Sequence, residues 1–140
     1  MIRSMKSAFR GIAVAMLLLA VEPVRAEYLL IQLKVYGLDC EVCARGVSAS
    51  VGRLAGVETV VVSLKKGTVE LLLARGNKFK MSDLRNRIRE NGFRPMEATV
   101  TAVGRSNGSK FEVLGSGESY DIGSRAAKTD AIVEISFEVH

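Results

Sequence analysis

Apolar and polar positions alternate at the start of the globular part of this chain and then change to a helical spacing. Residues 28–36 read Tyr-Leu-Leu-Ile-Gln-Leu-Lys-Val-Tyr, and their alternation predicts a strand that Gly37 ends. Over residues 43–54 the apolar positions recur every three or four residues, namely Cys43, Val47, Val51 and Leu54. This spacing predicts a helix of about three turns, which Gly56 ends.

The same two patterns recur in the following fifty residues. Residues 57–64 and 69–74 are rich in β-branched and apolar side chains, and the intervening Lys-Lys-Gly-Thr predicts the turn of a hairpin. Residues 81–91 have helical spacing and end before Gly92, and residues 93–103 alternate again. The order β-α-β-β-α-β predicts an α+β fold, a ferredoxin-like βαββαβ sandwich with two helices on one face of a four-stranded antiparallel sheet. Its expected core consists of Leu33, Val35, Val47, Val51, Leu54, Val60, Val62, Leu71, Leu84, Ile88 and Val100.

The C-terminal part of the chain has a weaker pattern. Residues 110–114 and 131–139 have the character of strands, whereas residues 115–130 are rich in Gly, Ser and charge and predict turns. We therefore expect residues 104–140 to form a short C-terminal β extension, either paired with the sheet edge or folded as a separate hairpin layer. The segment is too short for a second core.

The N-terminus predicts export. Residues 1–10 carry three basic and no acidic side chains, residues 11–21 are almost purely apolar, and Val24-Arg25-Ala26 resembles a cleavage site. The alternative is a retained membrane anchor, but the apolar run is short against the roughly 20 residues that cross a bilayer. We therefore expect residues 1–26 to be a signal peptide, the protein to be periplasmic or secreted, and no stable membrane insertion after cleavage.

The charge balance follows from this leader. The chain has a formal net charge of +5, but residues 1–26 hold four of the basic and only one of the acidic side chains. The remaining chain is nearly balanced and lacks Trp, so nucleic-acid binding is not expected. Nothing in the sequence resembles a nucleophile–base pair, a phosphate loop or paired catalytic carboxylates, and we predict that the protein is not an enzyme.

The chain has two cysteines, Cys40 and Cys43, at the predicted junction of the first strand and the first helix. A disulfide between residues three apart closes a small loop and adds little stability, so a local chemical role is expected. Unpaired N–H groups at a helix start favour the thiolate, and a Cys-x-x-Cys loop lets both sulfurs bind one ion. Soft thiolates suit Hg(II), Cu(I), Zn(II) or Cd(II), and a site with two thiolates is open, which suits capture and release.

Two other interpretations of the cysteine pair stay open at this point. An exported Cys-x-x-Cys also occurs in thiol–disulfide oxidoreductases. Here the interior residues are Glu41-Val42, Trp is absent and Pro95 is the only proline after the leader, all unlike a thioredoxin-type site. The second alternative is that both cysteines are inert small apolar residues.

Residues 37–43, Gly-Leu-Asp-Cys-Glu-Val-Cys, resemble the Gly-Met-x-Cys-x-x-Cys signature of the heavy-metal-associated domain family. The Gly56-Val57 and Gly92-Phe93 pairs resemble further family positions in the expected order, so the resemblance covers residues 27–103. It implies a metal site at Cys40 and Cys43, with Leu38 packed under the loop and the Phe93 ring beside it. With its leader, the chain resembles the periplasmic mercury-binding branch most.

Asp39 departs from the common family pattern, which has Thr or a similar residue there. In relatives that handle zinc, cadmium or lead an Asp at this position is typical, which makes Asp39 a candidate third ligand that favours a divalent ion over Cu(I). The alternative is that Asp39 is the helix N-cap or a partner of the helix dipole. The extension over residues 104–140 has no counterpart in the minimal family domain.

The resemblance thus implies an exported soft-metal-binding protein or metallochaperone that passes its ion to a membrane transporter or reductase. The alternatives are a periplasmic thiol–disulfide oxidoreductase and an adaptor that keeps the fold without binding metal.

Overall fold

The computed structural model describes residues 27–123 and 132–140, and the predicted signal peptide lies outside these residues. The strands are β1 (Tyr28–Tyr36), β2 (Val57–Ser63), β3 (Thr68–Leu73), β4 (Arg94–Asn107), β5 (Lys110–Val113), β6 (Glu118–Asp121) and β7 (Ile132–Val139). The helices are α1 (Glu41–Val51) and α2 (Met81–Glu90). Neither helix is long and apolar enough to cross a membrane, as far as the described residues extend.

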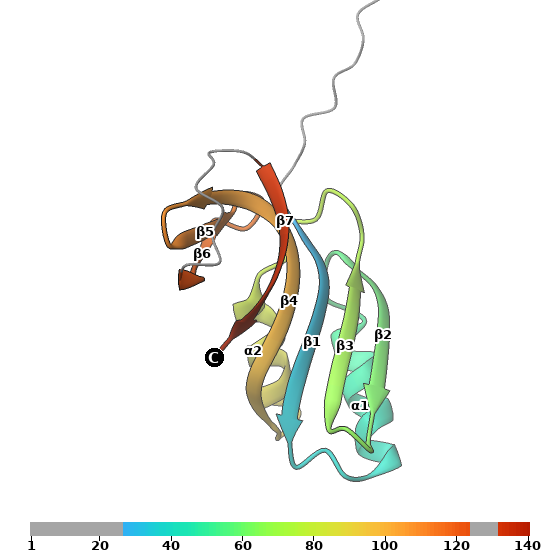
Figure 1. Ribbon diagram of the computed structural model, residues 1–140. Coiled ribbons are helices and arrows are strands. Elements are labelled where there is room, and N and C mark those ends of the chain that lie inside the picture. The colour runs from blue at the N-terminus through green and yellow to red at the C-terminus, as the bar shows by residue number, and fades with distance from the viewer. Residues whose placement is uncertain (1–26, 124–131) are drawn as a thin grey trace, which may run out of the picture.

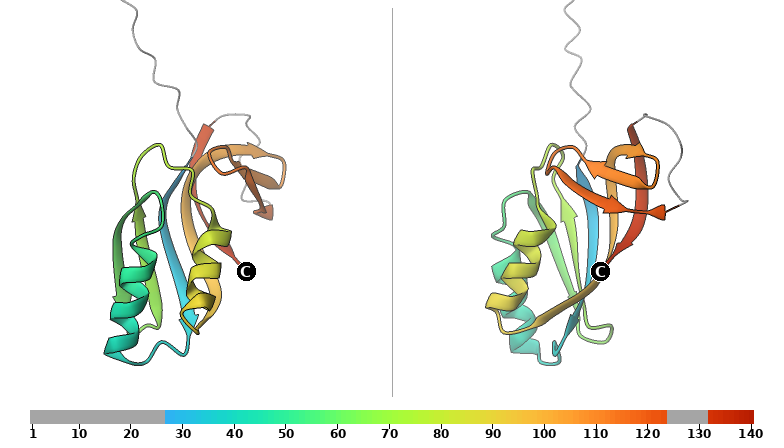
Figure 2. Two further views of the ribbon diagram at one scale, coloured as in Figure 1. Left: turned by 180° about the vertical axis from the view of Figure 1, so that it is seen from behind. Right: turned by 90° about the vertical axis from the view of Figure 1, so that its left-hand side faces the viewer.

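The strands form one antiparallel sheet in the order β2-β3-β1-β4, to which the extension adds β5, β6 and β7 (Figure 1). Both helices cover the same face of this sheet, as the view from behind shows (Figure 2). The predicted ferredoxin-like βαββαβ sandwich with a C-terminal β extension is therefore confirmed.

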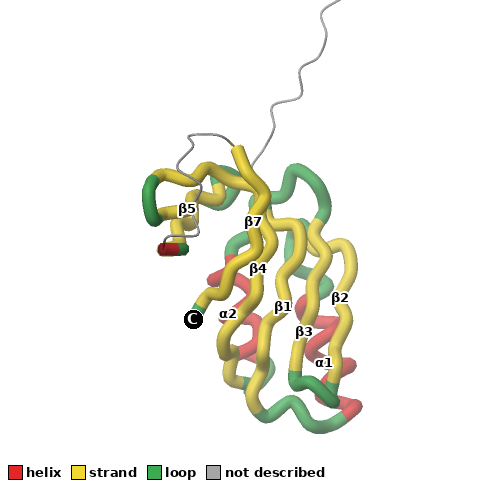
Figure 3. Tube along the Cα trace, in the orientation of Figure 1, coloured by secondary structure: helices red, strands yellow, loops and turns green. Residues whose placement is uncertain are grey.

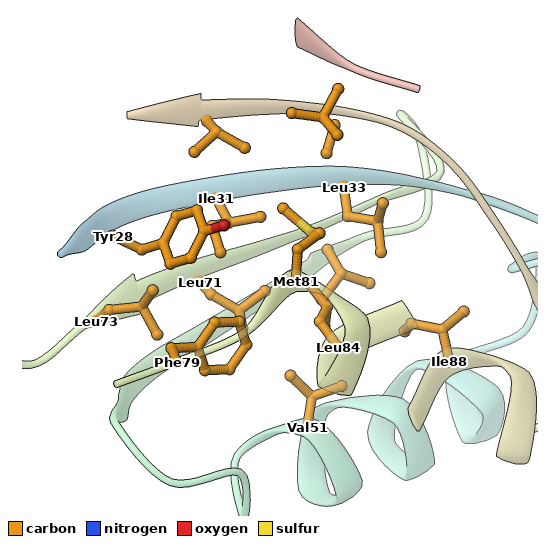
Figure 4. Packing of buried hydrophobic residues seen from close by; sticks show 14 of the residues in the cluster. Tyr28, Ile31, Leu33, Val51, Leu71, Leu73, Phe79, Met81, Leu84 and Ile88 are labelled. Carbon is orange, nitrogen blue, oxygen red and sulfur yellow. The ribbon is translucent and has the colours of Figure 1, made fainter. Parts of the chain in front are cut away.

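The core lies between the sheet and the two helices. Alternate residues of β1 and β3 point to the helices, and Leu33 and Leu71 are fully buried against Leu84 and Ile88 of α2 (Figure 4). Eight of the predicted core residues are buried, and Leu54, Val60 and Val62 are half-buried because they lie toward the outer strand β2. The periodicity thus identified the inward faces correctly.

The extension belongs to the same core. Strand β4 continues past residue 103 to Asn107, and β5 and β6 form a hairpin that folds over the helix side of the sheet (Figure 2). Phe111 and Val113 of this hairpin are fully buried in the cluster that the helices and β1 form. Both arrangements expected for the extension occur, because β7 pairs with the sheet strand β4 and β5–β6 forms a hairpin layer. The prediction of turns over residues 115–130 was wrong for residues 118–121, because β6 pairs with β5 despite its polar composition.

A group of polar side chains ties the hairpin to the rest of the domain. The Tyr28 hydroxyl donates a hydrogen bond to Glu118 and lies 2.6 Å from the Tyr120 hydroxyl. The same Glu118 oxygen accepts the backbone N–H of Met81 at 2.9 Å and so satisfies one donor of the first turn of α2. Burial raises the pKa of Tyr28, and it raises the pKa of Tyr120 to about 12. Both phenols therefore stay protonated and able to donate near neutral pH.

Replacing Ser106 with alanine is expected to stabilise the protein. Ser106 lies on β4, is 1% exposed, and its hydroxyl has no hydrogen-bond partner within the part of the chain that the structure describes. A buried unsatisfied hydroxyl costs about 1–3 kcal/mol, so Ser106→Ala should raise the free energy of unfolding by about 1 kcal/mol. Urea denaturation measures this, with exposed Ser119 on β6 as the control position for a serine-to-alanine change. A decrease in the free energy of unfolding in Ser106→Ala would contradict the prediction that the buried Ser106 hydroxyl destabilises the protein.

Candidate metal site

The cysteine loop is positioned by the end of β1 and the start of α1, at the end of the sheet remote from the β5–β6 hairpin (Figure 1). The chain leaves β1 at Gly37, whose φ of +87° favours glycine because L side chains rarely adopt it. Leu38 then points into the core and is 4% exposed, whereas Asp39 is exposed. The loop is thus held from below by one buried apolar side chain while its polar residues face solvent.

Cys40 is the N-cap of α1. Its backbone is extended, with φ −125° and ψ 144°, and its sulfur accepts the backbone N–H of Cys43 at 3.0 Å. A sulfur in this position faces the positive end of the helix dipole and one of its unpaired N–H groups, and both favour the thiolate form once the sulfur is reduced. The position of Cys40 at the helix N-cap therefore gives a structural reason to expect a stabilised thiolate at this residue.

The two sulfurs lie within bonding distance of each other. Cys40 and Cys43 form a disulfide, with their Cα atoms 5.1 Å apart, and both side chains are half-buried. Reduction with two electrons and two protons converts this bond into two thiols on the same loop. The backbone thus brings both sulfurs to one point, where they can bind one ion together.

Asp39 does not cap α1, because Cys40 occupies the N-cap position. The N-cap alternative for Asp39 was therefore wrong, and its exposed carboxylate is left without that role. Among the described residues no three His, Cys, Asp or Glu side chains gather into a metal-binding group. Glu41, between the two cysteines, forms an exposed ion pair with Arg45 at 3.6 Å, which contributes little to stability.

Phe93 lies beside the start of the loop. A Cβ at Gly37 would lie 3.8 Å from Cδ1 of Phe93, so the ring packs against the first residue of the loop. The structure thus brings Phe93 and Leu38 to the loop that holds both cysteines, while their role in metal binding stays a prediction.

The sequence analysis did not identify Asn91, which joins the C-terminal end of α2 to the last turn of α1. Its side-chain N–H₂ donates to the Ser50 hydroxyl at 3.0 Å and to the carbonyl of Arg87 at 2.7 Å. Arg87 also donates to the carbonyl of Ser50 at 3.1 Å. These bonds fix α2 against α1 just before Phe93. The only feature of the sequence that pointed to Asn91 was its position before Gly92 at a helix end.

Part of this chain is similar in sequence to known proteins. Residues 32–94 match the protein family described as "Heavy-metal-associated domain". The chain is 34% identical over 61 residues to the copper chaperone CopZ of Bacillus subtilis (strain 168). The aligned residues make up 44% of this chain and 87% of CopZ.

Two solved structures are also similar. A CopZ metallochaperone is 24% identical to this chain, with a TM-score of 0.45. The match spans 48% of this chain and 98% of the metallochaperone. Oxidized MerP from Ralstonia metallidurans CH34 is 19% identical, covers 49% and 94% of the two chains, and also has a TM-score of 0.45. The span matched by the family runs from β1 to the start of β4 and includes the cysteine loop.

Proposed function

Since this chain belongs to the heavy-metal-associated domain family, we propose that it captures a soft metal ion through Cys40 and Cys43 outside the cytoplasm and passes it to a membrane transporter. The observation that carries the proposal is the position of the two sulfurs. They lie side by side at the exposed start of α1, with Cys40 as the N-cap and Cys43 as its hydrogen-bond donor. A pair of sulfurs alone leaves an ion open to an incoming thiolate, which suits transfer by stepwise sulfur exchange.

The proposed cycle begins with reduction. In the disulfide neither sulfur is a thiolate, so the pair must gain two electrons from a thiol donor before it binds metal. Binding then releases the protons of the thiols, and the ion leaves when thiolates of the acceptor replace Cys40 and Cys43 one at a time.

A titration of the reduced and the oxidised protein tests this function. Reduced protein is expected to bind one Hg(II), Cu(I), Zn(II) or Cd(II) ion per chain in competition with a chelator. The disulfide form is expected to bind the same ion at least about a thousandfold more weakly, because thiolate is the ligand. The oxidised protein, re-reduced before a second titration, is the control for irreversible damage. Equal affinity in the two redox states would overturn the proposal.

We further propose that Asp39 shifts the preference toward divalent ions. Its carboxylate is exposed, is not used as the helix cap, and directly precedes Cys40. Carboxylates favour harder divalent ions, whereas Cu(I) prefers sulfur. Asp39→Ala should therefore weaken Zn(II) or Cd(II) binding by roughly tenfold and leave Cu(I) affinity nearly unchanged.

The control for Asp39→Ala is Glu41→Ala, which removes the same charge from the other side of Cys40. The measurement is the ratio of Zn(II) to Cu(I) affinity in the reduced proteins. If both substitutions change the ratio equally, the effect is general electrostatics and Asp39 is not a ligand.

A second candidate function is thiol–disulfide exchange, which the Cys40–Cys43 disulfide itself favours. It predicts catalytic turnover in the reduction of insulin by a thiol donor, lost in Cys40→Ser. Tight stoichiometric metal binding without such turnover favours the metal carrier.

A further inference from the structure

Strand β2 is an uncovered edge of the sheet. It is the first strand in the sheet order, and on its far side no strand lies among the described residues (Figure 3). The opposite edge of the four-stranded part is different, because β7 pairs with β4 from Ala98 to Arg105. The extension thus covers one edge of the family domain and leaves β2 open.

This edge is regular and carries few features that prevent pairing. The β2–β3 register runs without a break from Thr59 to Ser63, and its one irregularity lies between Val57 and Thr59. No Lys, Pro or Gly occurs within residues 57–63, and Val61 is 55% exposed on the face away from the helices. Val60 and Val62, on the helix side, stay half-buried because no neighbour covers them at the edge. Natural edge strands usually carry a charge, a proline or a bulge to avoid such pairing, and in β2 the one charge and the one bulge are confined to residues 57–59.

The charges at the two ends of β2 are complementary. Exposed Glu58 lies at its start, and exposed Lys65 and Lys66 lie just after its end. No ion pair involves any of the three within the described part of the chain. In an antiparallel pair of two β2 strands, the Glu58 end of each lies beside the lysine end of the other, so both ends attract. A parallel pair would instead bring like charges together.

We propose that two copies of this chain associate through antiparallel pairing of their β2 strands, which joins their sheets into one. The two-fold axis is perpendicular to the sheet, so the pairing is isologous. The cysteine loops then lie at opposite ends of the joined sheet, and both remain accessible. This dimer differs from one in which a shared metal ion bridges the cysteines, and it is independent of the proposed function. Because the paired segment is short, the association is weak and reversible.

Sedimentation velocity on protein produced from the full chain, reduced and without metal, tests the pairing across a wide range of concentration. We expect a concentration-dependent monomer–dimer equilibrium that Cys40→Ser/Cys43→Ser leaves unchanged. Val61→Lys should weaken it by at least about tenfold, because it places a charge in the middle of the edge. The matched control is Leu30→Lys, on the same sheet face but on β1, two strands from the edge, which should have little effect.

A charge swap keeps the test independent of folding, since all its positions are exposed. Glu58→Lys should weaken the dimer by roughly three- to tenfold, and adding Lys65→Glu should restore it. A chain that stays monomeric at the highest concentration overturns the proposal. A dimer that requires metal or the cysteines also overturns it, because such a dimer is bridged at the loop. A dimer that Leu30→Lys weakens as much as Val61→Lys does overturns it too, because that result indicates face-to-face packing of the sheets.

Discussion

Replacing both Cys40 and Cys43 with serine is expected to lower the affinity of the reduced protein for Hg(II) or Cu(I) at least about a thousandfold. Serine has nearly the same shape, but its hydroxyl is neutral at physiological pH and is a hard oxygen ligand, which soft ions bind poorly. Each single variant keeps one thiolate and should lie between the wild type and the double variant. Competition with a chelator of known affinity measures the loss.

The fold provides the control for these variants. Cys40 caps α1, and serine is among the preferred N-cap residues, so Cys40→Ser should keep the helix intact. The double variant is therefore expected to unfold at nearly the same temperature as the reduced wild type. Unchanged metal affinity in a folded double variant would mean that the ion binds elsewhere, and the cysteine pair would then not be the metal site.

Replacing Gly104 with alanine is expected to destabilise the protein by about 3 kcal/mol. Gly104 lies on β4 where the β5–β6 hairpin folds back onto the sheet. An added Cβ would overlap the carbonyl oxygen of Glu112 and lie 2.6 Å from the ring of Phe111. The ring is fully buried and the oxygen belongs to the backbone, so neither can move away without opening the hairpin.

Gly46→Ala is the matched control, because Gly46 lies within α1 and an added Cβ meets nothing within 4 Å. This substitution should stabilise the protein by about 0.5–1 kcal/mol, since alanine favours the helix over glycine. Urea denaturation of both variants measures the difference. Similar small effects would show that the hairpin does not pack closely on Gly104.

The order of elements and most of the core were predictable because both depend on local periodicity. Alternation in β1 and the three- and four-residue spacing in α2 reflect one buried face per element, and the structure buries those faces. The cysteine loop was predictable for a similar reason. A glycine turn between a strand and a helix places residues three apart on one loop, whatever the remainder of the chain does.

The extension shows where local pattern is insufficient. Strand β6 has a polar sequence, and it forms because β5 pairs with it and because Glu118 reaches Tyr28 and the start of α2. Neither Tyr28 nor the start of α2 is near β6 in the sequence. The same holds for Gly104, whose need for a small residue follows from a ring seven positions later that folds over it.

Side-chain periodicity and short-range spacing were sufficient to predict the ferredoxin-like arrangement and the two sulfur residues of the loop. Identifying Cys40, and not Asp39, as the cap of α1 required the folded structure, because a cap depends on the backbone angles at one residue. The folded structure was also needed to see that the extension completes the core and covers β4 while β2 stays open. Strand neighbours are chosen by contacts between distant segments, and composition or periodicity within a single segment does not specify them.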